Sequence, residues 1–220
     1  MEPFRPTAII NSRNNLQDSY DISAIILDKE NRGESSVMLT AFSSEKGLIY
    51  LFKRMSGKKT SLIPDLFDEI TCKIRQPDFS GNVPVTFLQS FEIVKHRQGI
   101  STSYNKLCSA SDISLIVKHN GENINETHSL YLLLSKTFEA IEKSKNMSSI
   151  HIKFLYLLTK EQGYAIKEDF FQSLSNDDKT VFAHILKTPS QYLDEYIQQS
   201  EKLYEMLKRW VQESTDIIIQ

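Results

Sequence analysis

The first half of the chain alternates apolar and polar residues with the period of two that is typical of β-strands. These stretches lie between glycines and prolines that favour turns. In the clearest case, Ile70, Cys72 and Ile74 alternate with polar neighbours. Five strands are expected, over residues 21–27, 36–43, 47–53, 69–76 and 85–93. Because no helical segment separates them, the pattern predicts a small antiparallel barrel or sandwich.

Beyond residue 101 the spacing becomes that of amphipathic helices. Apolar residues recur three and four positions apart, as they do between positions 130 and 141. Ser175 and the acidic residues after it are expected to cap one helix, and Gly163 to end another. The second half is therefore interpreted as a helical bundle.

Together the two patterns predict an α+β chain with three parts. An N-terminal extension covers residues 1–20, a five-stranded OB-type β-barrel covers 21–98, and an all-helical domain covers 99–220. The OB-fold is the commonest five-stranded barrel, and many of its members bind nucleic acids or oligosaccharides.

Composition narrows the classes of function. The formal net charge is −2, so any contact with nucleic acid must come from a local basic patch. The two cysteines, Cys72 and Cys108, have no CxxC spacing, so we expect both to be buried and neither to bind zinc. The sequence has no long apolar run and no secretory signal, which predicts a cytoplasmic protein without membrane contact.

Several motifs in order resemble those of the RecO family of recombination mediators. The resemblance covers roughly residues 22–170 and rests on an apolar first strand, a Gly-Glu-Ser turn, a basic connection, a Leu-Ile-Pro turn and a helix that ends in Gly-Tyr. These motifs lie at residues 24–27, 33–36, 39–49, 53–54, 58–61, 62–64, 154–158 and 163–164.

The resemblance implies DNA repair by homologous recombination, without a cofactor. A RecO-like protein binds single-stranded DNA, anneals complementary strands and, with a RecR-type partner, loads recombinase at gaps covered by single-stranded DNA-binding protein (SSB). It would be associated with the nucleoid during repair. The resemblance also implies that residues 100–110 form the first helix. The chain departs from the family in three ways: residues 165–220 hold no cysteine for the zinc module of many members, the second half is acidic, and about twenty residues before the barrel match no part of the family.

The predicted DNA contacts lie on the third strand and the loop after it. A string of cations could follow a phosphate backbone, and two aromatic residues could stack on bases. The cations are Lys46, Lys53, Arg54, Lys58 and Lys59, and the aromatic residues are Tyr50 and Phe52. The alternatives are a solvated loop and aromatic residues that pack in the core. Phe42 and Phe87 are further aromatic residues on expected strands.

The helical half is expected to bind the acidic, phenylalanine-ended tail of SSB. This needs an apolar pocket beside cations. His151, Lys153, Tyr156 and Lys160 are the candidates, since the last three share one helix face. An ordinary solvated face is the alternative.

Catalysis finds no support, so we expect a protein that is not an enzyme. The five histidines lack metal-binding spacing, and no phosphate-binding glycine motif occurs. The carboxylates Asp65, Asp68 and Glu69 could bind a metal, but they are more simply interpreted as a solvated turn. Two other functions remain open: an OB-fold that binds RNA, and a protein adaptor without nucleic-acid binding.

Overall fold

Five strands form the first half of the molecule. The computed structural model describes residues 19–55, 62–78 and 85–219. The strands are β1 (Ser19–Asn31), β2 (Ser36–Ser43), β3 (Gly47–Arg54), β4 (Glu69–Asp78) and β5 (Val85–Lys95). The prediction of five strands is confirmed, although most of the strands are longer than predicted. In particular, β1 begins at Ser19, inside the expected N-terminal extension.

The strands pair in the order β1-β2-β3-β5-β4, and the sheet closes into a barrel because β4 also pairs with β1. All neighbours are antiparallel except β3 and β5, which run parallel where Leu51 and Phe52 face Thr86 and Phe87. This pairing places β5 between β3 and β4, so β3 shares one surface with the two strands that follow it in the sequence.

Alternate side chains fill the inside of the barrel. On β4, Ile70, Cys72 and Ile74 are buried while Thr71 and Lys73 are exposed, as the period of two predicts. Burial raises the pKa of the Cys72 thiol to about 12. Cys72 is therefore a small apolar core residue, as expected for a buried free cysteine.

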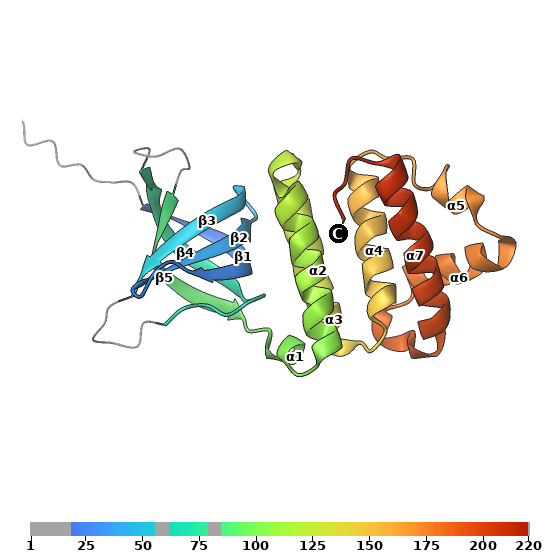
Figure 1. The fold of residues 1–220 in the computed structure, drawn as a ribbon, viewed down its shortest axis with the longest axis horizontal. Helices are drawn as coiled ribbons and strands as arrows, with labels where there is room; N and C mark the ends of the chain where they lie inside the picture. Colours follow the sequence, from blue (N-terminus) through green and yellow to red (C-terminus); the bar gives the residue numbers. More distant parts are fainter. Residues whose placement is uncertain (1–18, 56–61, 79–84, 220) are drawn as a thin grey trace, which may run out of the picture.

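The second half consists of helices. They are α1 (Gln98–Ser101), α2 (Tyr104–Asn120), α3 (Thr127–Lys143), α4 (Met147–Glu161), α5 (Phe170–Ser173), α6 (Asn176–Lys187) and α7 (Ile197–Ser214), with short 3₁₀ turns η1 (Gly121–Asn123), η2 (Ser190–Tyr192) and η3 (Asp194–Tyr196). In Figure 1, α2 and α3 stand between the barrel and a layer that contains α4 and α7. The α+β prediction is confirmed.

The predicted helix boundaries agree in part with the structure. Ser175 accepts a hydrogen bond from the Asp178 amide at the start of α6, and Gly163, with φ of +83°, follows the end of α4. The expected helix over 100–110 is instead two helices, separated at Thr102 and Ser103. Cys108 is only half-buried, which corrects the expectation that both cysteines are buried.

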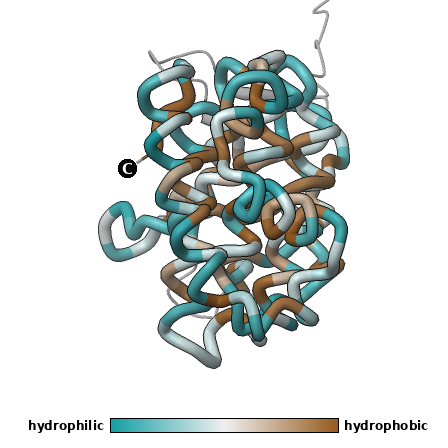
Figure 2. Tube along the Cα trace, turned by 90° about the vertical axis from the view of Figure 1, so that its right-hand side faces the viewer, coloured by the Kyte–Doolittle hydropathy of each residue, from teal (hydrophilic) through white to brown (hydrophobic). Residues whose placement is uncertain are grey.

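The barrel and the helices share one apolar core. Ile25, Leu27, Phe42 and Phe67 from the barrel side belong to the same buried cluster as the apolar faces of α2, α3, α4 and α7. In Figure 2, which looks from the helical end, apolar segments lie among the helices while hydrophilic segments predominate in the outer loops. Within the described ranges, no helix combines the length and the apolar character needed to cross a membrane.

Candidate nucleic-acid interface

The outer face of β3 carries two of the predicted aromatic residues. Leu51 is fully buried inside the barrel, so its neighbours Tyr50 and Phe52 point outward. Both are half-buried, and neither belongs to the two buried apolar clusters. Phe42 differs from them, because it is fully buried against the helices. Packing therefore accounts for Phe42 and leaves Tyr50 and Phe52 on the surface of the barrel.

Phe52 is part of a row that crosses three strands. Its ring meets that of Phe87 on β5 edge to face, with centroids 5.6 Å apart and an interplanar angle of 89°. On the other side of Phe87, the guanidinium carbon of Arg75 on β4 lies 5.5 Å from the ring centroid. The Arg75 Nε is buried and has no hydrogen-bond partner in the described part of the chain. We call Tyr50, Phe52, Phe87 and Arg75 the outer row.

Unpaired cations flank this row. Among the described residues, Lys53, Arg54, Lys73 and Arg75 take part in no ion pair, whereas the remaining barrel cations other than Lys46 pair with carboxylates. These paired cations are Lys29, Arg32 and Lys95. These four cations therefore carry positive charge that no ion pair within the described ranges offsets, although Asp21 of β1 lies opposite Lys73 in the strand pairing.

The predicted basic string does not form one cluster. Lys46 lies in the turn before β3, where its ammonium is 5.4 Å from the centre of the Tyr20 ring. Lys53 is seven residues further along the chain, roughly 23 Å away for an extended strand. This separation removes Lys46 from the site that contains Lys53 and Arg54. Lys58 and Lys59 lie outside the described residues.

Sequence reasoning did not select Arg75 and Lys73, and it left Phe87 without a role. The available signal was weak, since Lys73 and Arg75 appear only as the polar half of an alternating strand. Their importance comes from the pairing of β3 with β5 and of β5 with β4, which joins positions 52, 87 and 75. In chemical terms, the row offers aromatic faces for stacking and cations for phosphates.

The structure places the predicted partner site on α4 mostly inside the helical bundle. His151 is 5% exposed and stacks on Tyr204, with ring centroids 4.9 Å apart. Its Nε2 is buried without a hydrogen-bond partner among the described residues. Burial lowers the pKa of His151, so the imidazole is neutral at pH 7. A buried neutral side chain cannot attract an acidic peptide, which corrects the prediction for His151.

The other three candidates share a face of α4, but that face is largely covered. Lys153 Nζ donates hydrogen bonds to the Thr188 carbonyl and, at 3.0 Å, to Ser190 Oγ. Tyr156 is half-buried and packs edge to face against Phe182 of α6. Lys160 alone is exposed. The place of the expected apolar pocket is therefore occupied by α6 and the segment after it.

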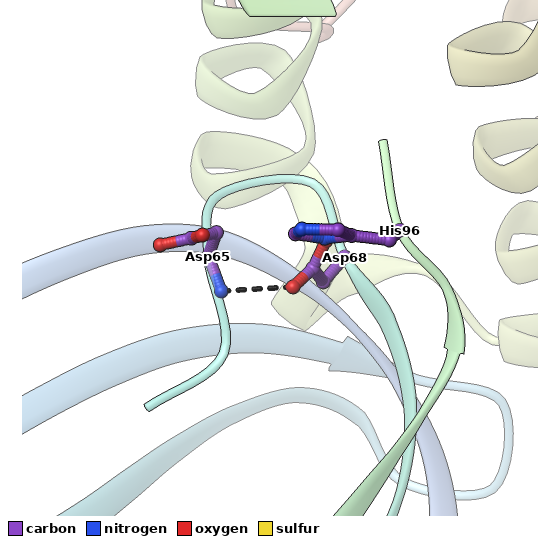
Figure 3. A group of neighbouring side chains, drawn as sticks. All are labelled: Asp65, Asp68 and His96. Carbon is purple, nitrogen blue, oxygen red and sulfur yellow. Dashed lines mark hydrogen bonds and ion pairs between the residues drawn. The ribbon is translucent and has the colours of Figure 1, made fainter. Parts of the chain in front are cut away.

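The acidic turn before β4 is not solvated, contrary to expectation. Asp68 is 1% exposed and Glu69 is 8% exposed, and only Asp65 faces the solvent. Figure 3 shows the group that surrounds Asp68. Its Oδ1 lies 2.6 Å from His96 Nδ1, and its Oδ2 accepts a hydrogen bond of 2.9 Å from the Asp65 amide. Asp68 thus ties the turn to the segment that follows β5.

Asp65, Asp68 and His96 also have the composition of a metal site, because their ligand atoms lie within 4.8 Å of one another. However, both oxygens of Asp68 already accept hydrogen bonds, including one of 3.3 Å from the Arg97 amide. The hydrogen bond with Asp68 raises the pKa of His96, which favours the imidazolium that pairs with the carboxylate. The group is satisfied as an ion pair, and a metal would have to displace these contacts.

Comparison with known proteins leaves the family open. No family model matches the chain, and no curated protein is significantly similar to it in sequence. The function is therefore argued from the geometry of the outer row.

Proposed function

We propose that this protein binds single-stranded DNA across the outer row of its barrel. The observation that carries the proposal is the continuous contact from Phe52 to Phe87 to Arg75, on three adjacent strands and beside unpaired cations. Proteins that bind single strands combine a positive groove for the phosphates with aromatic side chains on which bases stack. Every base has a π-face, so such a surface tolerates many sequences.

The barrel is proposed to be of the OB type. Its five strands, its closed order and its single parallel pair β3–β5 support this interpretation. OB-folds bind their ligands on the face around strands 2 and 3 and with the loops that follow strands 1 and 4. Tyr50 and Phe52 lie on β3, opposite Thr40 and Met38 of β2. The outer row therefore begins on the face that this fold ordinarily uses.

The proposal extends to the role that the RecO resemblance implies, namely annealing of complementary strands and help in loading recombinase with a RecR-type partner. Annealing fits a surface that holds bases by stacking, because stacking leaves the pairing edges of the bases free. Recognition of the SSB tail stays part of the proposal, but it requires a surface other than the covered face of α4.

The proposal can be tested by measuring the binding of a fluorescein-labelled oligo-dT through its fluorescence anisotropy. We expect Phe52→Leu and Phe87→Leu to weaken binding about 5- to 150-fold, since removal of a base stack costs about 1–3 kcal/mol. Leucine preserves apolar contacts while it removes the flat ring. Tyr192→Leu is the matched control, because Tyr192 is 68% exposed in η2, in the helical half.

The salt dependence tests the cations separately. Lys73→Gln and Arg75→Gln should each make the negative slope of log affinity against log salt shallower, by about 0.7 for each phosphate that the variant no longer neutralises. Lys167→Gln, an exposed lysine in the helical half, should leave the slope unchanged. If folded variants of Phe52, Phe87 and Arg75 all bind like the parent, the outer row is not the interface.

Competition with oligo-U and with duplex DNA distinguishes the remaining functions. Preferential displacement by oligo-U would favour an RNA-binding protein. A parent protein that binds none of the three would favour a protein adaptor. A parent that binds oligo-dT but does not accelerate the annealing of complementary strands would leave DNA binding without the mediator role.

A further inference from the structure

A hollow of about 610 Å³ opens between the end of β3 and the middle of β5, and its lining begins at Lys53, the residue that follows Phe52 in β3. Lys53 and Arg54 line it from β3, and Ile63 contributes an apolar side chain from the segment before β4. Its volume lies within the range of about 300–1,000 Å³ found for small-molecule sites. The hollow is therefore large enough for a flat ring with its attached groups.

The path of β5 explains the polar lining of this hollow. Ile74 pairs with Leu88, but Lys73 pairs with Ser90, so Gln89 is an extra residue in β5. Such a bulge changes the direction of nearby side chains, and bulges are over-represented next to active sites. Around this bulge the consecutive residues Gln89, Ser90 and Phe91 all line the hollow.

The hollow also combines a ring with positive charge. The half-buried Phe91 ring lies 5.7 Å from Lys53 Nζ, measured to the ring centroid. Lys53 and Arg54 have no ion pair within the described part of the chain. An apolar ring, amide and hydroxyl groups and two cations on one rim match the parts of a nucleotide: a flat base, its polar edge and its phosphate.

We propose that this hollow holds one unstacked nucleobase of a bound single strand and gives the protein a preference for certain bases. Phe91 stacks on the base once the Lys53 ammonium moves from over its ring to an adjacent phosphate, and Arg54 contacts the next phosphate. Gln89 and Ser90 hydrogen-bond to the base edge. This proposal rests on the proposed DNA binding and adds selectivity to it. The outer row itself is tolerant of sequence, because it offers only stacking and charge.

The experiment compares oligo-dA, oligo-dC and oligo-dT of equal length in the same anisotropy assay. We expect the parent to prefer one base by roughly fivefold or more, as for a good contact to a base edge. Gln89→Ala should abolish this preference and leave the salt slope unchanged, since glutamine neutralises no phosphate. Gln199→Ala, an exposed glutamine on α7, is the matched control and should retain the preference.

Phe91→Leu provides a second variant that preserves apolar contacts with the barrel core. It should weaken binding of all three oligonucleotides, by about 5- to 150-fold for removal of one stack. Equal affinity of the parent for the three bases, or a preference that survives Gln89→Ala, would overturn the base pocket and leave the outer row standing. Failure of the parent to bind any oligonucleotide would instead remove the proposed function itself.

Discussion

Arg97 joins the barrel to the helices, and its removal should destabilise the whole chain. The side chain is 4% exposed. It donates hydrogen bonds of 3.1 Å to Glu142 Oε2 and 3.0 Å to the Ser135 carbonyl, and its Nη2 lies 3.5 Å from Glu69 Oε2. Replacement of one partner of a buried ion pair costs about 3–5 kcal/mol, because the remaining charge is left uncompensated.

The surroundings of Arg97 indicate that the loss of stability in Arg97→Met lies near the lower end of that range. Burial raises the pKa of Glu69, but hydrogen bonds from Ser135, Tyr131 and Lys95 outweigh it and hold the pKa below its usual value. These three partners remain in the variant. Glu142 is partly exposed, so water can reach it. We therefore expect the free energy of unfolding to fall by about 3 kcal/mol.

Urea denaturation measures this change with two probes. Trp210 is the only tryptophan, so its fluorescence reports on the helical half, while far-UV circular dichroism reports on both halves. Coincident transitions in the parent would confirm that the shared core unfolds cooperatively. Arg209→Met, at an exposed position on α7, should lie within about 0.5 kcal/mol of the parent. A loss below about 1 kcal/mol for Arg97→Met, or full additivity with Glu142→Gln, would refute the reasoning.

Three further predictions concern groups whose environment differs from the sequence interpretation. Burial lowers the pKa of His151 in the folded chain below its ordinary value of 6.5. As the pH falls below 6.5, the unfolded chain therefore binds a proton that the folded chain does not. The free energy of unfolding should then drop by at most about 1.4 kcal/mol per pH unit. His151→Leu should flatten this dependence in unfolding measured at pH 5.5 and 7.5, roughly one unit either side of that value. Lys153→Met should cost about 1–3 kcal/mol in urea denaturation, whereas the exposed Lys160→Met should cost almost nothing. Metal analysis of protein purified without a tag should find no bound zinc. Added Mn²⁺ should not raise the melting temperature, because both carboxylate oxygens of Asp68 already accept hydrogen bonds. A metal-dependent rise in melting temperature that Asp68→Asn removes would contradict this.

The strands could be predicted because each one obeys a local rule. Alternation on β4 correctly placed Ile70, Cys72 and Ile74 inside the barrel. The length of β1 could not be predicted in the same way, since its last residues, Lys29 to Asn31, are polar. They are strand only because they pair with residues 37–39 of β2. Local pattern thus identified the elements, and long-range pairing set their ends.

Periodicity identified residues that share a face but not whether that face is open. Lys153, Tyr156 and Lys160 do share one side of α4, yet α6 and residues 188–190 cover most of it. The prediction for Asp68 and Glu69 is wrong for a related reason. Their partners His96, Tyr131 and Ser135 are 28 to 66 residues away in the sequence. Charged residues in a row resemble a solvated turn until the fold supplies buried partners.

The rings of the outer row stand out because they have no packing role in the two buried apolar clusters. The inner side chains fill the barrel, and Phe42 and Leu48, at one end of β2 and β3, pack against the helical core. Tyr50, Phe52 and Phe87 contribute to neither cluster. Half-buried rings beside unpaired cations stabilise a folded chain only slightly, and an unusual surface of this kind is typical of a binding site. Stacked bases would cover the rings and phosphates would neutralise the cations, so under the proposed function a single strand would supply both of the partners that the fold leaves out.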